Sequence, residues 1–141
     1  MDLKRFFQER GYAEEVLAKP PTVILNFGLV PERVEGNLVI LSDDRPLLIA
    51  NYAPGAVRSR ERGLLAYARL AYPQKPPALV LQTNGREFSL LEVASGKEIA
   101  FGGPEIVPPY EKLKDYSLPP PLDPKKRLIE EKILFIQTTG G

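Results

Sequence analysis

The chemistry open to this chain depends on oxygen-bearing and basic side chains, because the sequence contains no cysteine and no histidine. Disulfide bonds, thiol catalysis, Cys/His zinc sites and a Ser-His triad are therefore excluded. Any metal ion would have to be bound by oxygen ligands alone. Three carboxylates are candidate ligands: Asp43 and Asp44 lie in the segment 42–46, and Glu61 lies on a predicted helix. The other interpretation of Asp43 and Asp44 is that they are solvated turn residues.

A group of arginines, Arg58, Arg60 and Arg62, lies where the predicted helix over 57–72 begins. A helix N-terminus with clustered arginines is suited to binding phosphate, so these residues are candidate nucleic-acid contacts. Only Arg58 and Arg62 share one helical face at this spacing, and a solvated helix surface is the other interpretation. The formal net charge is +1, which argues against broad, tight, unspecific binding to DNA.

The elements that must position these side chains can be read from the hydrophobic pattern. The chain has 141 residues, 43% hydrophobic and 26% charged, which is typical of one globular domain. Asp2 is the expected N-cap of a helix over 2–10, and a short turn is expected over 13–18. Strands are expected over 22–27, 38–41, 47–52, 78–82, 86–93 and 98–101, with turns at 34–36, 42–46 and 84–85. Several strands are apolar on both faces, so we expect an α/β fold: a mixed sheet of about five strands flanked by helices.

Residues 104–141 differ in composition from the α/β domain expected over 1–103. Seven of the 15 prolines lie between 104 and 124, which predicts a proline-rich, extended arm. Asp123-Pro124 resembles a helix start, whereas 133–139 fit either a helix or a strand. The apolar end of this arm has two candidate partners, its own domain or a second copy of the chain, and the latter would make a homodimer.

Six short segments in a fixed order carry a family resemblance over residues 3–100. These segments are Glu9–Tyr12, Arg45–Ile49, Ala53–Gly55, Tyr67–Ala68, Thr83–Gly85 and Gly96–Ile99. In their order and spacing the chain resembles the N-terminal nuclease domain of type I restriction enzyme R subunits, in a short stand-alone form. That domain belongs to the PD-(D/E)xK nuclease superfamily, so the resemblance implies a restriction-endonuclease-like sheet.

Active members of that superfamily carry an Asp on one strand, and a Glu and a Lys two residues apart on the neighbouring strand. Residues i and i+2 of a strand point to the same face, so the Glu and Lys converge beside the Asp. The carboxylates bind Mg²⁺ there, and the Lys positions or polarises the attacking water. The corresponding positions here are Asn37, Ala50 and Tyr52, and Gly63 replaces a Gln often found on the following helix. These three side chains offer a divalent cation almost nothing: they either fill a buried pocket or form a remodelled small-molecule or metal site.

The leading hypothesis is a catalytically inactive restriction-nuclease-like domain that acts by binding or assembly and uses no cofactor. The resemblance implies DNA as its weak partner. One alternative is an active Mg²⁺-dependent DNA endonuclease that uses the displaced carboxylates Asp43, Asp44 or Glu61. Another is a structural homodimer, joined through the C-terminal arm, with no nucleic-acid partner. No apolar run approaches the roughly 18 residues of a membrane span, so we expect a cytoplasmic protein with no membrane partner.

Overall fold

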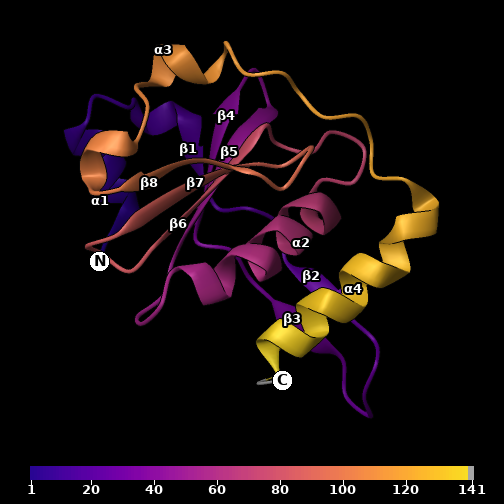
Figure 1. Cartoon of the computed structure of the whole chain (residues 1–141). Helices are drawn as coiled ribbons and strands as arrows, with labels where there is room; N and C mark the ends of the chain where they lie inside the picture. The colour runs from indigo at the N-terminus through magenta and orange to yellow at the C-terminus, as the bar shows by residue number, and fades with distance from the viewer. Residues whose placement is uncertain (140–141) are drawn as a thin grey trace.

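A mixed sheet of six strands forms the centre of the computed structural model, which describes residues 1–139 (Figure 1). Along the sheet the order is β1-β4-β5-β6-β7-β8, and β5 and β6 are parallel while the other neighbours are antiparallel. The strands are β1 Leu17–Ala18, β4 Leu38–Ser42, β5 Arg45–Tyr52, β6 Leu79–Thr83, β7 Phe88–Glu92 and β8 Glu98–Gly102. The predicted mixed α/β sheet is thereby confirmed, with one strand more than expected.

Helices and a small hairpin complete the described residues. The α-helices are α1 Leu3–Glu9, α2 Glu61–Ala71, α3 Tyr110–Leu113 and α4 Pro124–Thr138. Three 3₁₀ turns are η1 Glu14–Val16, η2 Arg58–Arg60 and η3 Pro104–Ile106. The strands β2 Val23–Leu25 and β3 Glu32–Val34 form a separate two-stranded sheet. No helix within residues 1–139 is both long and apolar enough to cross a bilayer.

Each face of the six-stranded sheet is covered by its own core. Leu48 of β5 and Leu81 of β6 lie in one core with Phe7 of α1, and we call this side the α1 face. Ile49 and Val80, which alternate with them, lie in the other core with the buried side chains of α2, and this side is the α2 face. Successive residues of a strand point to opposite faces, so the continuous apolar runs are explained and the prediction that helices cover both faces is confirmed.

The predicted local signals of the first helix and the central hairpin are present. The Asp2 carboxylate accepts a hydrogen bond from the backbone N–H of Arg5 at 3.1 Å and caps α1. Asp43 and Asp44 form the β4–β5 turn with φ values of 49° and 65°. Short polar side chains tolerate this left-handed backbone, and a two-residue turn of this kind matches the twist of a hairpin.

Three sequence expectations differ from the structure in the N-terminal third of the chain. The strand expected over 22–27 is only β2, and residues assigned to a turn at 34–36 begin within β3, with which β2 pairs. Val23 and Leu25 face the core of the α2 face while Ile24 is exposed, so one side of β2 is buried although it does not pair with the main sheet. The turn expected over 13–18 ends in β1, which pairs with β4 through Leu17 and Ala18.

Residues 104–139 run across the molecule from the α1 face to the α2 face. Val107 and Leu113 pack in the core of the α1 face, and Leu134 of α4 packs in the core of the α2 face (Figure 1). Between them the backbone N–H of Leu122 donates to the carbonyl oxygen of Pro73 at 2.7 Å. The open alternative over 133–139 is resolved as helix up to Thr138, and residues 140 and 141 lie outside the described part.

Candidate functional site

The three positions that the resemblance singles out lie at one end of the β4–β5 hairpin. Ala50 pairs with Leu38, the first residue of β4, so Asn37 lies just beyond that pair. The backbone N–H of Asn37 donates to Asn51 Oδ1 at 2.8 Å, and the backbone N–H of Tyr52 donates to Asn37 Oδ1 at 2.7 Å. The two side-chain amides therefore extend the ladder where the strands separate, and Asn37 and Tyr52 are held side by side.

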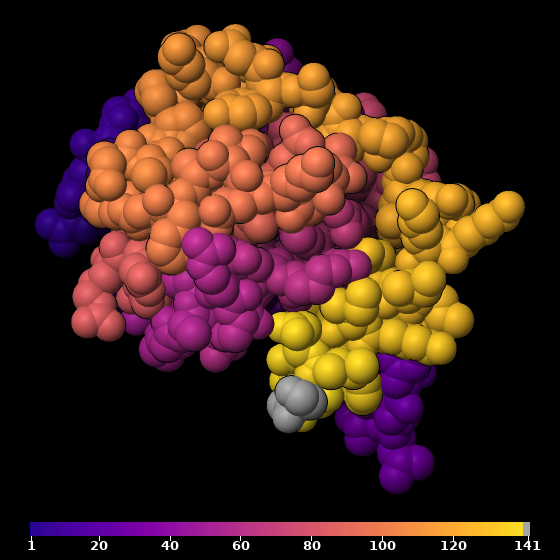
Figure 2. Space-filling view, viewed as in Figure 1, coloured from indigo at the N-terminus to yellow at the C-terminus, as the bar shows by residue number. Residues whose placement is uncertain are grey.

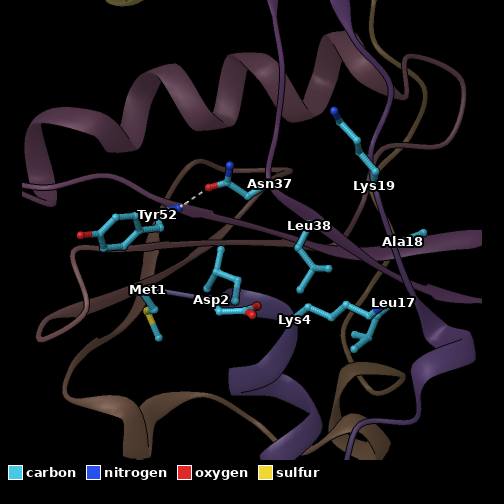
Figure 3. Close-up of a pocket in the computed structure, with 10 residues that line it drawn as sticks. Met1, Asp2, Lys4, Leu17, Ala18, Lys19, Asn37, Leu38 and Tyr52 are labelled. Atoms are coloured by element: carbon cyan, nitrogen blue, oxygen red, sulfur yellow. Dashed lines mark hydrogen bonds between the residues drawn. The ribbon is translucent and has the colours of Figure 1, made fainter.

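A cavity of about 490 Å³ opens beside this strand end on the α1 side, and we call it the α1-face cavity. Figure 3 shows Asn37, Leu38 and Tyr52 on one side and the start of α1 on the other. Ala50 is fully buried in the core and does not line it. Tyr52 is half-buried against the same core. The strand geometry thus places two of the three positions on one cavity wall.

The charges around the α1-face cavity are not those of a divalent-cation site. Its lining holds one carboxylate, Asp2, together with the ammonium groups of Lys4 and Lys19. Asp2 is already the cap of α1, and Lys4 forms an ion pair with Glu14 at 3.0 Å. Hard divalent cations prefer several anionic oxygens, so this donor set fits Mg²⁺ poorly.

The displaced carboxylates do not gather near Tyr52. Asp43 and Asp44 are exposed at the opposite end of the eight-residue strand β5, a span of roughly 20 Å. Glu61 is on the other face of the sheet, where its carboxylate accepts a hydrogen bond from the Ser89 hydroxyl. Within residues 1–139, no three acidic side chains lie close enough together to hold a metal ion.

The candidate phosphate contacts Arg58, Arg60 and Arg62 diverge from one another. Arg58 donates to Glu98 of β8 at 2.7 Å and lies over the ring of Phe101. Arg62 makes two hydrogen bonds to Glu130 of α4, at 2.6 and 3.0 Å. Arg58 and Arg62 do not share a face because Arg58 lies in the 3₁₀ turn η2 and not in α2. Arg60 is exposed and lies between them.

A polar row that the sequence analysis did not single out crosses the α2 face. Asn51 of β5 pairs with Gln82 of β6, and Gln82 pairs with Ser89 of β7, so the three side chains are neighbours on one face. Glu61 of α2 continues the row through its bond to Ser89. A Gln inside an otherwise apolar strand was the available signal, but only the register shows that it has polar neighbours.

Comparisons with protein-family models, with curated proteins and with solved structures give no match to this chain. The restriction-enzyme resemblance therefore stays a prediction that depends on the quoted segments.

Proposed function

We propose that this chain is a catalytically inactive, restriction-nuclease-like domain that acts by binding or assembly. The observation that carries the proposal is which side chains occupy the end of the β4–β5 hairpin, namely those of Asn37, Ala50 and Tyr52. The resemblance implies a catalytic cluster at these positions, and they offer no carboxylate. A nuclease of this type needs anionic ligands to hold the metal that stabilises charge on the phosphate.

A cleavage assay tests the loss of catalysis. Supercoiled plasmid is incubated with the full chain and either Mg²⁺ or Mn²⁺, and we expect it to remain intact. Cleavage that disappears in Glu61→Ala or Asp44→Ala would establish the endonuclease alternative and end the proposal. The circular dichroism spectra of both variants must match that of the wild type, so that a loss of cleavage is attributed to the missing carboxylate and not to unfolding.

Weak DNA binding is the form of binding that the resemblance implies. Arg58 and Arg62 are each bonded to a carboxylate, whereas exposed Arg60 has no such bond within residues 1–139. We expect retardation of DNA at low salt that weakens steeply as salt rises. Arg60→Ala should reduce it more than Arg33→Ala, an exposed arginine on β3 that serves as the matched control. Equal loss in the two variants would remove Arg60 from the interface.

Self-assembly is a second candidate function, favoured by exposed aliphatic side chains. The tip between β2 and β3 carries Leu29, 106% exposed, and Val30, 75% exposed. Figure 2 shows this purple segment projecting beyond the yellow helix α4. Ile129 and Ile136 of α4 are also exposed. Exposed aliphatic side chains on neighbouring segments are typical of a protein interface, and a second copy would match them with the same surface.

A further inference from the structure

A second cavity of about 320 Å³ lies on the α2 face, at the carboxyl ends of the parallel strands β5 and β6, and we call it the α2-face cavity. It is lined by the ends of β5 and β6, by α2 and α4, and by the segment 34–37 that connects β3 to β4. β5, α2 and β6 form a unit in which two parallel strands are joined by a helix. In sheets of this kind, ligands are bound beyond the carboxyl ends of the parallel strands.

Gln82 is the most informative residue of the α2-face cavity. It is only 2% exposed, it lines the cavity, and no hydrogen bond joins its side-chain amide to another residue of the described chain. The side-chain oxygen and nitrogen of Gln82 are not completely shielded, and they face the cavity. Burying an amide without a partner is unfavourable, and a ligand in the cavity would supply that partner.

Polar groups around Gln82 provide further contacts. Asn51 is its neighbour across the parallel pair, and the Asn51 oxygen already accepts from the backbone of Asn37, which leaves the amide nitrogen as a donor. Gln137 of α4 also lines the cavity, held within 3.1–3.3 Å of where a side chain on Gly63 would begin. Arg60 is exposed and supplies a positive charge to the lining.

The remaining lining has a smaller apolar part and no net charge, which suits a neutral ring better than a polyanion. Leu64 and Leu134 offer apolar surface, and Tyr67 adds an aromatic ring. Glu35 offsets the charge of Arg60, so the lining is close to neutral. Side-chain amides present a donor and an acceptor together, which is the arrangement that recognises the edge of a nucleobase. A volume of this size is within the ordinary range for small-molecule sites.

We propose that the α2-face cavity binds the base of a nucleotide, with Gln82 and Asn51 bonding to the base edge and Arg60 contacting its 5′-phosphate. The same chemistry is offered by a free mononucleotide and by an unstacked base of single-stranded nucleic acid. Asn37 and Tyr52 also line this cavity, but the inference does not depend on the restriction-enzyme resemblance, because it is argued from Gln82, Asn51 and Arg60.

Calorimetric titration of the full chain with AMP, GMP, CMP and UMP tests the proposal, with ribose 5-phosphate as the ligand that lacks a base. We expect saturable binding of at least one nucleotide, about tenfold or more tighter than ribose 5-phosphate. Gln82→Met keeps an unbranched side chain of similar length and removes the amide, so it should weaken the nucleotide about tenfold or more. Gln74→Met, the same change at an exposed position, should leave affinity unaltered.

Arg60→Gln gives a second, independent readout at an exposed residue whose change does not disturb the core. It should lower affinity for the nucleotide and leave affinity for the corresponding nucleoside unchanged. Displacement of the nucleotide by a short single-stranded oligonucleotide would identify nucleic acid as the source of the base, and failure to displace would identify a free nucleotide.

Three results would overturn the proposal: no saturable binding of any of the four nucleotides, ribose 5-phosphate bound as tightly as they are, or wild-type affinity in Gln82→Met. Metal-dependent plasmid cleavage would instead contradict the proposed function and leave this site untouched. The two failures are therefore distinguishable.

Discussion

At the scale of single residues, Glu130 is a buried carboxylate that is held by two arginines. Its side chain is 7% exposed and is bonded by Arg62 and by Arg69, the latter at 3.1 Å. Burial by itself would raise the pKa of Glu130, but the hydrogen bonds and charges of the two arginines outweigh burial and hold the pKa below its ordinary value. Arg69 also donates to the carbonyl oxygen of Val93 at 2.5 Å, so the cluster joins α4, α2 and the end of β7.

Replacing Glu130 by Gln should lower the free energy of unfolding by about 2 kcal/mol, because two arginines lose their anionic partner. A carboxylate whose folded pKa is depressed stabilises the fold above its unfolded pKa, and this stability is lost as pH falls through the folded pKa. The difference between wild type and Glu130→Gln should therefore be full above the ordinary value of 4.5 and shrink below it. Urea unfolding at several pH values measures it, and a difference that stays constant into acid would contradict the ion-pair explanation.

Gly36 is the second residue with a sharp structural requirement. A Cβ there would lie 2.7 Å from Tyr67 Cε2 and 2.9 Å from Pro20 Cγ. Tyr67 cannot easily move, because its hydroxyl donates to the carbonyl oxygen of Pro21 at 2.5 Å. Burial raises the pKa of Tyr67 to about 12, so the hydroxyl stays a donor at neutral pH.

Gly36→Ala should accordingly destabilise the protein by about 2 kcal/mol, since a methyl group is forced into an occupied space. Gly28→Ala is the control, because the nearest atom to its Cβ would be 3.7 Å away, at ordinary contact distance. Thermal unfolding of both variants makes the comparison, and equal melting temperatures would show that the Tyr67 region gives way easily.

At the scale of elements, the packing of α4 against α2 depends on a few specific residues. Its side chains reach α2 in three ways: Leu134 in the core, Glu130 in the arginine cluster, and Gln137 against Gly63. A Cβ at Gly63 would lie only 3.1 Å from Gln137 Cβ, so the missing side chain lets the two helices pack this closely without adjustment. The residue that departs from the resemblance at that position thus has a packing role in this fold.

Leu134→Ala should release α4 before the rest of the domain, with a cost of about 3 kcal/mol for the buried side chain. Hydrogen exchange measures the effect segment by segment. We expect backbone amides of α4 to lose protection while those of β5 and β6 keep it. Leu128→Ala, at a position 52% exposed on the same helix, should change neither. Loss of protection throughout the sheet would show that α4 is part of a single cooperative unit.

At the scale of the whole molecule, the described residues form a six-stranded sheet with both faces covered, and the hairpin of β2 and β3 projects from it with an apolar tip. The tip between β2 and β3 and the outer surface of α4 lie next to each other, since Phe27 contacts Phe135 with ring centroids 5.3 Å apart. The same arm whose Leu134 completes the core therefore also contributes to the exposed apolar surface.

If this surface joins two copies, light scattering of the full chain should give the mass of a dimer. Leu29→Ser/Val30→Ser should return it to a monomer, because two exposed aliphatic groups leave the interface. Leu118→Ser, another exposed aliphatic residue in the proline-rich segment, is the control and should keep the dimer. A monomeric wild type at high concentration would contradict self-assembly. Point variants are preferred to deleting residues 124–141, since deletion would also expose the core around Leu134.

Part of the geometry of the candidate site could be predicted from the spacing of residues along β5. The period of two along β5 predicted that Ala50 and Tyr52 share the α1 face, and the structure places both on that side. The ion pairs of Arg58 and Arg62 could not be predicted in the same way, because each partner comes from a distant segment. Glu98 lies 40 residues from Arg58, and Glu130 lies 68 residues from Arg62. Long-range ion pairs leave no local pattern in a sequence.

The sequence by itself determined the local elements: the Asp2 cap, the turn at Asp43 and Asp44, the doubly buried strands and the helix that contains α2. These depend on backbone preferences and on hydrophobic period, which act between residues close in the chain. Only the tertiary structure decided that β2 pairs with β3, that β1 joins the sheet, and that Gln82 meets Asn51 at a cavity. Those pairings depend on which distant segments bury one another, and short strands carry too few residues to specify that choice alone.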